Sequence, residues 1–336
     1  MRATYKKIAA GSVIAATILA GSVGTLMAQD KPVIATVVKI SGIPWFDRME
    51  TGVKAFQEAN ADVTASQSGP ATADSAQQLQ IVQDLVAKGV NALAVVPMDP
   101  AVLEGTFKRA IERGTIVVTH EADNQVNTMA DVEAFDNGEY GKALNERLAE
   151  CMGKAGKWTT FVGSLGSRTH LQWVGAGEEN AKQYKDMELV DPNNESFDDA
   201  NATYEKAKEI LRKHPDIKGF QTSAGNDVLG VGRAIDEAGL TGKVCLVGTG
   251  LPNPSADLLE SGAITAIGFW DPKLAGMAMN SVAKTLLSGQ KLTDGMDLGV
   301  EGYNKVTVKK GAGEGLLIVG NGMVLADKST YKKYMF

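Results

Sequence analysis

KPVIATVVKISGIPWFDRMETGVKAF, residues 31–56, is the stretch that decides the fold. It begins with a β-branched run, 33–40, of strand length, which Gly42 and Pro44 then interrupt. Pro44 suits the first position of a helix, where its missing N–H has no cost. From there apolar residues recur at helical spacing, at Phe46, Met49, Val53 and Phe56. The stretch therefore predicts a strand, a polar loop and a helix.

This unit is the first step of an open parallel α/β sheet, which binds ligands beyond the carboxyl ends of its strands. Lys39 directly follows the predicted strand, and Trp45 and Phe46 open the predicted helix. We therefore expect these three side chains to contact a ligand. Two alternatives stay open, because Phe46 fits equally well in the core and a strand-end lysine can simply be solvated.

Short apolar runs alternate with amphipathic segments along the whole chain, which predicts parallel α/β architecture. One series ends near residue 135, and a second of similar size runs from Thr159 to Ser288. The length of 336 residues also exceeds what one core usually covers. We therefore predict two similar lobes with a ligand between them. The last fifty residues are irregular and rich in glycine.

The N-terminal segment has the three-part layout of a secretory signal peptide. Arg2, Lys6 and Lys7 precede an apolar stretch, Ile8–Leu26, and the small Ala28 marks the expected cleavage site. We predict that residues 1–28 are removed. The alternative is an uncleaved anchor, because the apolar stretch approaches the ~20 residues that a membrane span needs.

Charge and cysteine content narrow the class of protein further. After cleavage the chain keeps 31 Lys and Arg against 40 Asp and Glu, a formal charge of −9 instead of −6. Nucleic acids and anionic lipids bind clustered basic residues, so neither is predicted as a partner. Two cysteines do not form a disulfide scaffold. Cys245 lies in an apolar run and is predicted to be a buried small side chain, with a bridge to Cys151 as the less favoured alternative.

Polar and aromatic side chains gather at the predicted strand ends. C–H faces of a sugar pack on aromatic rings, and its hydroxyls need both donors and acceptors, so the set predicts a polyhydroxylated ligand. Simpler roles exist for some members, because Asp123 suits a turn and Asn226 or Asp227 a helix cap. The residues are Lys39, Asp99, Glu121 and Asp123 in the first series, Arg168, His170, Gln172, Asn226, Asp227 and Asp271 in the second, with Trp45, Phe46, Trp173 and Trp270 nearby.

Enzyme signatures are absent from the sequence. It contains neither a Gly-rich nucleotide-binding motif nor a G-x-S-x-G nucleophile motif. His120, His170 and His214 lie far apart without metal-ligand spacing, so no metal or cofactor is predicted. We predict a binding protein rather than an enzyme. The alternative is a secreted two-lobed enzyme acting on glycosides, in which Glu121 and Asp271 would form an acid–base pair.

Several motifs resemble those of the periplasmic sugar-binding proteins of ABC importers, which have the type I fold. They comprise the signal peptide, Pro44-Trp45-Phe46, Val96-Pro97-Met98-Asp99-Pro100, Phe135-Asp136-Asn137-Gly138 and Gly225-Asn226-Asp227. The resemblance covers essentially the whole mature chain. It is greatest to the branch of autoinducer-2-binding and rhamnose-binding proteins, through Lys39, Gln172-Trp173, Phe269-Trp270-Asp271, Gly320-Asn321-Gly322 and the C-terminal Lys333-Tyr334-Met335-Phe336.

The resemblance implies a ligand-binding set, although the match is uneven. Lys39 occupies the position at which the autoinducer-2 receptor has its ligand-binding lysine. Glu121 occupies a position at which that receptor has an aspartate, whose side chain is one methylene shorter. The residues that the second lobe would contribute differ more from those of the autoinducer-2 receptor. The predicted ligand is therefore a sugar or polyol, with autoinducer-2 as the alternative. The positions concerned there are Thr169 and His170, in place of Asp-Gln, and Ala224 and Asn226, in place of residues that contribute backbone.

The resemblance also implies Rossmann-like lobes joined by crossover segments that act as hinges. Crossovers are expected near Asp136, near 268–271 and near 295–300. The predicted first lobe is 29–135 with about 270–297, and the predicted second lobe is 136–269 with about 298–336.

The same resemblance implies a function in transport. The lobes would close on the ligand, because contacts from both lobes exist only in the closed form. That form would be presented to an inner-membrane ABC permease by a monomer in the periplasm. We further predict that Lys39 and Asp271 grip the ligand from opposite sides, with a structural ion pair between them as the alternative.

Overall fold

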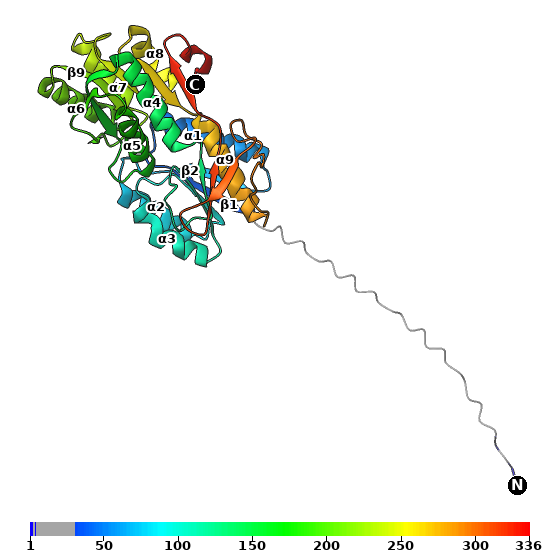
Figure 1. Ribbon diagram of the computed structural model, residues 1–336. Coiled ribbons are helices and arrows are strands. Elements are labelled where there is room, and N and C mark those ends of the chain that lie inside the picture. The colour runs from blue at the N-terminus through cyan, green and yellow to red at the C-terminus, as the bar shows by residue number, and fades with distance from the viewer. Residues whose placement is uncertain (3, 5–30) are drawn as a thin grey trace. The chain divides into compact units, whose positions relative to one another are not determined.

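The computed structural model describes residues 31–336, together with residues 1, 2 and 4. The apolar stretch and cleavage site of the predicted signal peptide lie outside these described residues. Residues 31–336 contain two seven-stranded sheets (Figure 1). The first, in spatial order, contains β12 (Thr307–Lys310), β13 (Leu316–Val319), β5 (Ala130–Glu133), β4 (Ile116–His120), β3 (Ala92–Val95), β1 (Val33–Val37) and β2 (Thr64–Ser68). Its strands are parallel apart from β12.

Helices cover both faces of this first sheet, and alternate residues of β1 show how. Ile34 belongs to a core cluster with residues of α1 (Pro44–Ala59) and α9 (Pro272–Leu287). Ala35 and Val37 belong to another, with residues of α2 (Ser75–Ala87) and α3 (Pro100–Glu112). A strand buried on both faces reads as a nearly continuous apolar run, as residues 33–38 do apart from Thr36. Pro44 begins α1, as the sequence predicts.

The second sheet repeats this arrangement. In spatial order it contains β14 (Val324–Asp327), β11 (Ala266–Phe269), β10 (Cys245–Thr249), β9 (Ile217–Thr222), β6 (Ala155–Val162) and β7 (Asp186–Leu189), and β8 (Asn194–Glu195) also pairs with β6. The prediction of two α/β lobes with helix-flanked sheets is confirmed. Its helices are α4 (Asn137–Met152), α5 (Arg168–Ala181), α6 (Ala200–Lys213), α7 (Asp227–Glu237) and α8 (Pro252–Ser261), and the 3-10 helix η1 (Tyr331–Tyr334) packs near α8.

The chain crosses between the sheets where β5 leads into α4, where β11 leads into α9, and between β13 and β14. The first two crossovers lie near Asp136 and 268–271, where they are expected. The prediction of a third near 295–300 is wrong, because β12 and β13 pair within the first sheet and the crossing follows at 320–323. The assignment of the whole segment 298–336 to the second lobe therefore fails for residues 307–319. An irregular Gly-rich sequence gives no periodicity from which these pairings could be read.

Aspartate side chains begin several helices of the described part. The side chain accepts a backbone N–H of the first turn, which satisfies a donor that the helix itself leaves unpaired. Two of these caps, Asp99 on α3 and Asp271 on α9, are predicted site residues. The others are Asp74 on α2, Asp136 on α4 and Asp199 on α6.

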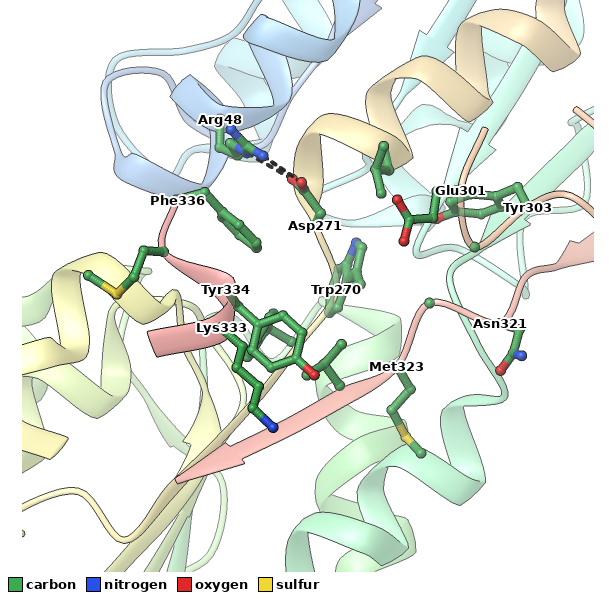
Figure 2. A pocket seen from close by; sticks show the side chains of 16 residues that line it. Arg48, Trp270, Asp271, Glu301, Tyr303, Asn321, Met323, Lys333, Tyr334 and Phe336 are labelled. Atoms are coloured by element: carbon green, nitrogen blue, oxygen red, sulfur yellow. Dashed lines mark hydrogen bonds and ion pairs between the residues drawn. The ribbon is translucent and has the colours of Figure 1, made fainter. Parts of the chain in front are cut away.

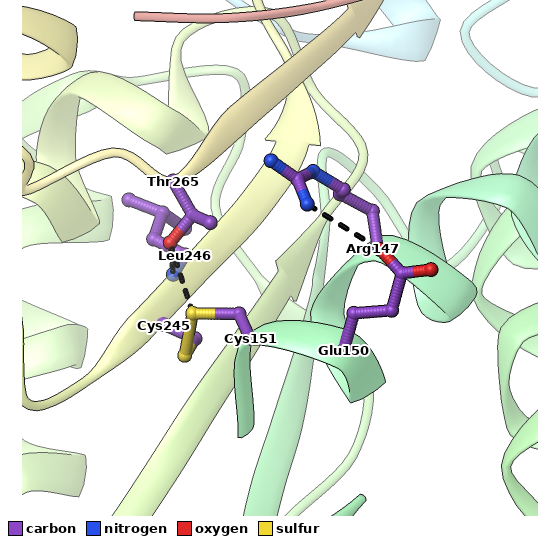
Figure 3. The surroundings of a disulfide bond; sticks show 6 residues. All are labelled: Arg147, Glu150, Cys151, Cys245, Leu246 and Thr265. Atoms are coloured by element: carbon purple, nitrogen blue, oxygen red, sulfur yellow. Dashed lines mark hydrogen bonds and ion pairs between the residues drawn. A yellow bond between two sulfur atoms is a disulfide. The ribbon is translucent and has the colours of Figure 1, made fainter. Parts of the chain in front are cut away.

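A disulfide joins Cys151 to Cys245 inside the second lobe, with the two Cα atoms 6.0 Å apart (Figure 3). The prediction that Cys151 and Cys245 stay unbridged is therefore wrong, and the less favoured alternative is correct. Cys245 is nevertheless buried in β10, as predicted. The bridge forms because α4 packs along β10 and its last turn meets the start of that strand. A separation of 94 residues hides this proximity in the sequence.

Candidate functional site

A small cavity of about 20 Å³ lies between the strand ends of the two lobes. It has room for about one water molecule and is far smaller than the ~300–1,000 Å³ typical of small-molecule sites, so the lobes must separate before a ligand can enter. Both lobes and one crossover contribute side chains to it. They are Lys39, Ile43, Trp45, Phe46 and Glu121 from the first lobe, His170, Trp173, Asp198, Ser223, Gly225 and Thr249 from the second, and Trp270 from the crossover.

Lys39 and Glu121 form a buried ion pair in this cavity. Lys39 follows β1, Glu121 follows β4, and Lys39 Nζ donates to Glu121 Oε2 at 2.5 Å. Burial alone would raise the pKa of Glu121, but the charge of Lys39 prevails and lowers it to about 2. Glu121 also has a φ of 58°, a left-handed conformation that is uncommon for a residue other than glycine. Such strain is typical of functional sites.

His170 is a neutral donor at the second wall. The backbone N–H of Gly163 donates to its Nδ1 at 3.0 Å, so the ring proton resides on Nε2. Burial lowers the pKa of His170 to about 3, and the positive charge of Lys39 acts in the same direction. The imidazole therefore stays neutral around pH 7 and can donate one hydrogen bond from Nε2.

Asp198 is a site residue that the sequence analysis missed. It is buried, it lines the cavity, and its Oδ2 has no hydrogen-bond partner among residues 31–336. Burial raises the pKa of Asp198 to about 6, although Lys39 opposes the shift. A signal existed in the sequence, because Asp199 alone suffices to cap α6. Its neighbour Asp198 was therefore free for another role.

Three indole rings meet at the cavity. The centroid of Trp270 lies 4.6 Å from that of Trp45 and 5.6 Å from that of Trp173, both with edge-to-face geometry. The indole N–H of Trp173 donates to Asn137 Oδ1 at 2.7 Å. The walls therefore offer apolar ring surface beside the polar groups of Lys39 and His170.

Three predicted ligand-binding residues, Asp99, Asp123 and Gln172, lie outside the cavity and form hydrogen bonds within the protein. Asp123 accepts hydrogen bonds from Arg168 Nε at 2.8 Å and from Gln172 Nε2 at 2.5 Å. Asp99 caps α3 by accepting the N–H of Ala101 at 2.9 Å. These polar groups find protein partners, and none of them lines the cavity.

Three others support the site from behind. The hydroxyl of Thr169 lies 3.4 Å from Glu121 Oε2, and the N–H of Ala224 donates to Asp227 at 2.9 Å. Asn226 Nδ2 donates to the carbonyl of Asp198 at 3.0 Å and so fixes the loop that presents this carboxyl group.

Asp271 lies away from the cavity. It pairs with Arg48 through bonds of 2.9 and 2.6 Å and caps α9 (Figure 2). Lys39 and Asp271 therefore line different pockets, so the prediction that both grip one ligand gains no support. The alternative of an ion pair between them is wrong, because Lys39 pairs with Glu121 and Asp271 with Arg48. The proposed acid–base pair of Glu121 and Asp271 is not brought together at this cavity either.

The Arg48–Asp271 pair borders a second, larger pocket of about 450 Å³ beside the crossover at Trp270, which we call the hinge side. Figure 2 shows Tyr334 and Phe336 of the C-terminal segment beside Trp270 and Asp271. The guanidinium of Arg48 lies 4.4 Å from the ring centroid of Phe336. The C-terminus thus packs against the crossover that carries Trp270.

Two further features bear on the kind of site. No group of three or more His, Cys, Asp or Glu within residues 31–336 is placed to hold a metal ion. The helices of the same segment all fall short of the length and apolarity needed to cross a membrane.

Residues 34–291 match the periplasmic binding protein domain family. The D-ribose/D-allose-binding protein of Pseudomonas aeruginosa is 28% identical over 306 residues, which cover 85% of this chain and 93% of that protein. The D-allose-binding periplasmic protein of Escherichia coli is 27% identical over 244 residues, covering 69% and 77%.

Solved structures share the fold at lower identity. A Clostridium phytofermentas ABC transporter solute-binding protein with bound L-rhamnose superposes with a TM-score of 0.84 at 19% identity, covering 91% of this chain and 98% of that one. LsrB from Clostridium saccharobutylicum in complex with AI-2 gives 0.82 at 20% identity, covering 90% and 100%. With residues 34–291 matched and both lobes reproduced, the chain belongs to the periplasmic binding protein domain family and has the two-lobed type I fold.

Proposed function

We propose that this protein is the periplasmic solute-binding component of an ABC importer, and that it captures a neutral sugar or sugar-like polyol between its lobes. The observation that carries this proposal is the cavity of Lys39, Glu121, His170 and Asp198 among tryptophan rings. A donor-only imidazole N–H and an unpaired carboxylate oxygen suit a ligand whose hydroxyls both donate and accept. The similarity to ribose- and allose-binding proteins supports the same class.

The charge of the cavity supports a neutral ligand. One buried cation, Lys39, faces two carboxyl groups, Glu121 and Asp198, while His170 is uncharged. An anionic ligand would add a further buried negative charge, which is costly without a partner. Sugar acids and sugar phosphates should therefore bind much more weakly than the parent sugars.

A thermal-shift screen tests this proposal. The compounds are D-ribose, D-allose, L-rhamnose, D-arabinose, D-tagatose, D-fucose and autoinducer-2, with D-ribonate as the anionic control for D-ribose. A ligand at 100 times its dissociation constant adds about 2.7 kcal/mol to the free energy of unfolding. We expect at least one neutral sugar to raise the unfolding temperature and D-ribonate to leave it unchanged. Stabilisation by autoinducer-2 alone would favour the signalling receptor, and no stabilisation by any compound would contradict the proposal.

The alternative of a glycoside-acting enzyme has a separate test. After incubation with the purified protein, the bound sugar is recovered and its chemical identity is determined by chromatography and mass spectrometry. We expect it unchanged, since the two carboxylates expected to catalyse, Glu121 and Asp271, occupy different pockets. Conversion that follows the protein peak through purification would favour the enzyme.

Export and assembly follow from the same proposal. The mature protein should begin near Gln29, be released with the periplasmic fraction and elute as a monomer. Intact-mass measurement together with light scattering checks this. An intact N-terminal Met1 or quantitative sedimentation with membranes would contradict the export proposal.

A further inference from the structure

Three polar side chains meet across the mouth of the cleft without lining the cavity. Asp123 lies on the loop after β4 in the first lobe, and Arg168 and Gln172 lie one turn apart on α5 in the second. One carboxylate oxygen of Asp123 accepts from Arg168 at 2.8 Å and the other accepts from Gln172 at 2.5 Å. We call these three residues the mouth clasp.

The loop before α5 contacts the first lobe at a neighbouring point. A Cβ built at Gly166 would lie 2.9 Å from Asp99 Oδ2. Asp99 has little freedom to withdraw, because it caps α3 through the N–H of Ala101. The absence of a side chain at Gly166 is therefore what allows the two lobes to meet there.

We propose that the mouth clasp is a built-in latch, which shifts the equilibrium between open and closed lobes toward the closed form and prolongs ligand retention. The latch rests on the proposed sugar-binding function, since it regulates that same cleft. Its bonds join protein atoms of opposite lobes and disappear when the lobes separate. They therefore favour closure whatever occupies the cavity, and apparent affinity rises with the fraction of binding-competent protein.

The clasp is strong enough to bias the equilibrium but weak enough to release. The Arg168 side chain is 41% exposed and that of Asp123 is 20% exposed, so solvent screens the pair. Partly solvated ion pairs of this kind change an equilibrium constant by up to about fivefold. A latch of that size retains a ligand without preventing its delivery.

The test compares Asp123→Ala, Arg168→Ala and the double variant with a matched control. The control, Asp216→Ala, removes the Lys157–Asp216 pair of 2.9 Å, which lies wholly within the second lobe. Small-angle X-ray scattering without sugar measures the radius of gyration. Stopped-flow fluorescence of the cleft tryptophans measures dissociation of the probes D-ribose and L-rhamnose.

Asp123→Ala removes both bonds, so it should enlarge the radius of gyration and speed dissociation by up to about fivefold. Arg168→Ala leaves the Gln172 bond and should change both quantities in the same direction by less. The double variant should do no more than Asp123→Ala, because Asp123→Ala already removes the Arg168 contact. Asp216→Ala should behave as wild type, whereas Gly166→Ala, which wedges the mouth, should act like the clasp variants.

Wild-type scattering and wild-type dissociation rates in both single variants would overturn the latch, as would effects that add in the double variant. If neither probe sugar binds, that result counts against the proposed sugar-binding function and not against the latch. The scattering measurement needs no ligand, so it still decides whether the clasp holds the lobes closed.

Discussion

Two ion pairs flank Trp270, whose indole lines both the cleft cavity and the hinge-side pocket. On the cleft side the Lys39 and Glu121 side chains are only 3% and 4% exposed. On the hinge side, Arg48 and Asp271 are 28% and 15% exposed. The two pairs have similar chemistry and differ mainly in their access to water.

That difference in burial separates two roles. Removing two charges from water costs about as much as their attraction returns, so a buried pair is weak support for stability. Its free donors and acceptors are, however, fully available to a ligand. The hinge-side pair keeps solvent contact, and Asp271 also caps α9, which suits a structural role. We therefore expect the two pairs to respond differently to mutation, pH and salt.

The largest effect is expected for Lys39→Met, which leaves the buried carboxyl group of Glu121 without its cation partner. We expect a loss of about 3–5 kcal/mol in the free energy of unfolding, together with loss of sugar binding. Urea denaturation and calorimetric titration measure the two quantities. The double variant Lys39→Met/Glu121→Gln should recover much of the stability but none of the affinity. Wild-type affinity in the double variant would remove the pair from the binding site.

Asp198→Asn tests the unpaired carboxylate of the same cavity. The amide keeps the shape but offers one acceptor oxygen and an added donor, so a ligand hydroxyl loses its partner. We expect affinity to weaken by on the order of 1–3 kcal/mol, while stability without ligand changes less. Asp199→Asn, at the cap of α6, is the neighbouring control and should leave affinity unchanged.

The titration of Asp198 should make stability fall and ligand affinity rise as the pH increases. Because burial raises its pKa from 3.8 to about 6, the folded protein holds a proton there that the unfolded chain has released. Its contribution to stability is therefore complete below pH 3.8 and is lost as the pH rises through 6. Affinity should rise instead, because a ligand hydroxyl donates to the ionised form, by about tenfold between pH 5 and pH 8. Asp198→Asn should abolish both differences; slopes that persist in this variant would assign them to another group.

The smallest effect is expected on the hinge side. Arg48→Met removes the partly solvated pair while leaving Asp271 free to cap α9, so we expect about 1 kcal/mol less stability and nearly unchanged affinity. High salt should reduce the difference between wild type and this variant, because exposed charges are screened. The same salt series should leave the effect of Lys39→Met nearly unchanged. Equal salt dependence for both variants would contradict the division of roles.

Local chemistry was readable from the sequence wherever neighbouring residues decide it. The strand before Lys39 and the start of α1 at Pro44 both depend on short-range pattern. Trp45, Phe46, Lys39, Glu121 and His170 could be placed near the cleft, because parallel strands bring their carboxyl ends to one edge of a sheet.

Pairing between distant residues was decided only by the tertiary structure. Lys39 meets Glu121 and Asp271 meets Arg48, over separations of 82 and 223 residues. The side chain of Asp123 has the chemistry of a ligand contact, yet its bonds to Arg168 and Gln172 join the two lobes. Asp198 stands out only in the tertiary structure, where it is buried and its Oδ2 has no hydrogen-bond partner among residues 31–336. The sequence by itself determines which groups can donate, accept or carry charge, and only packing determines which partners they find and which are left for a ligand.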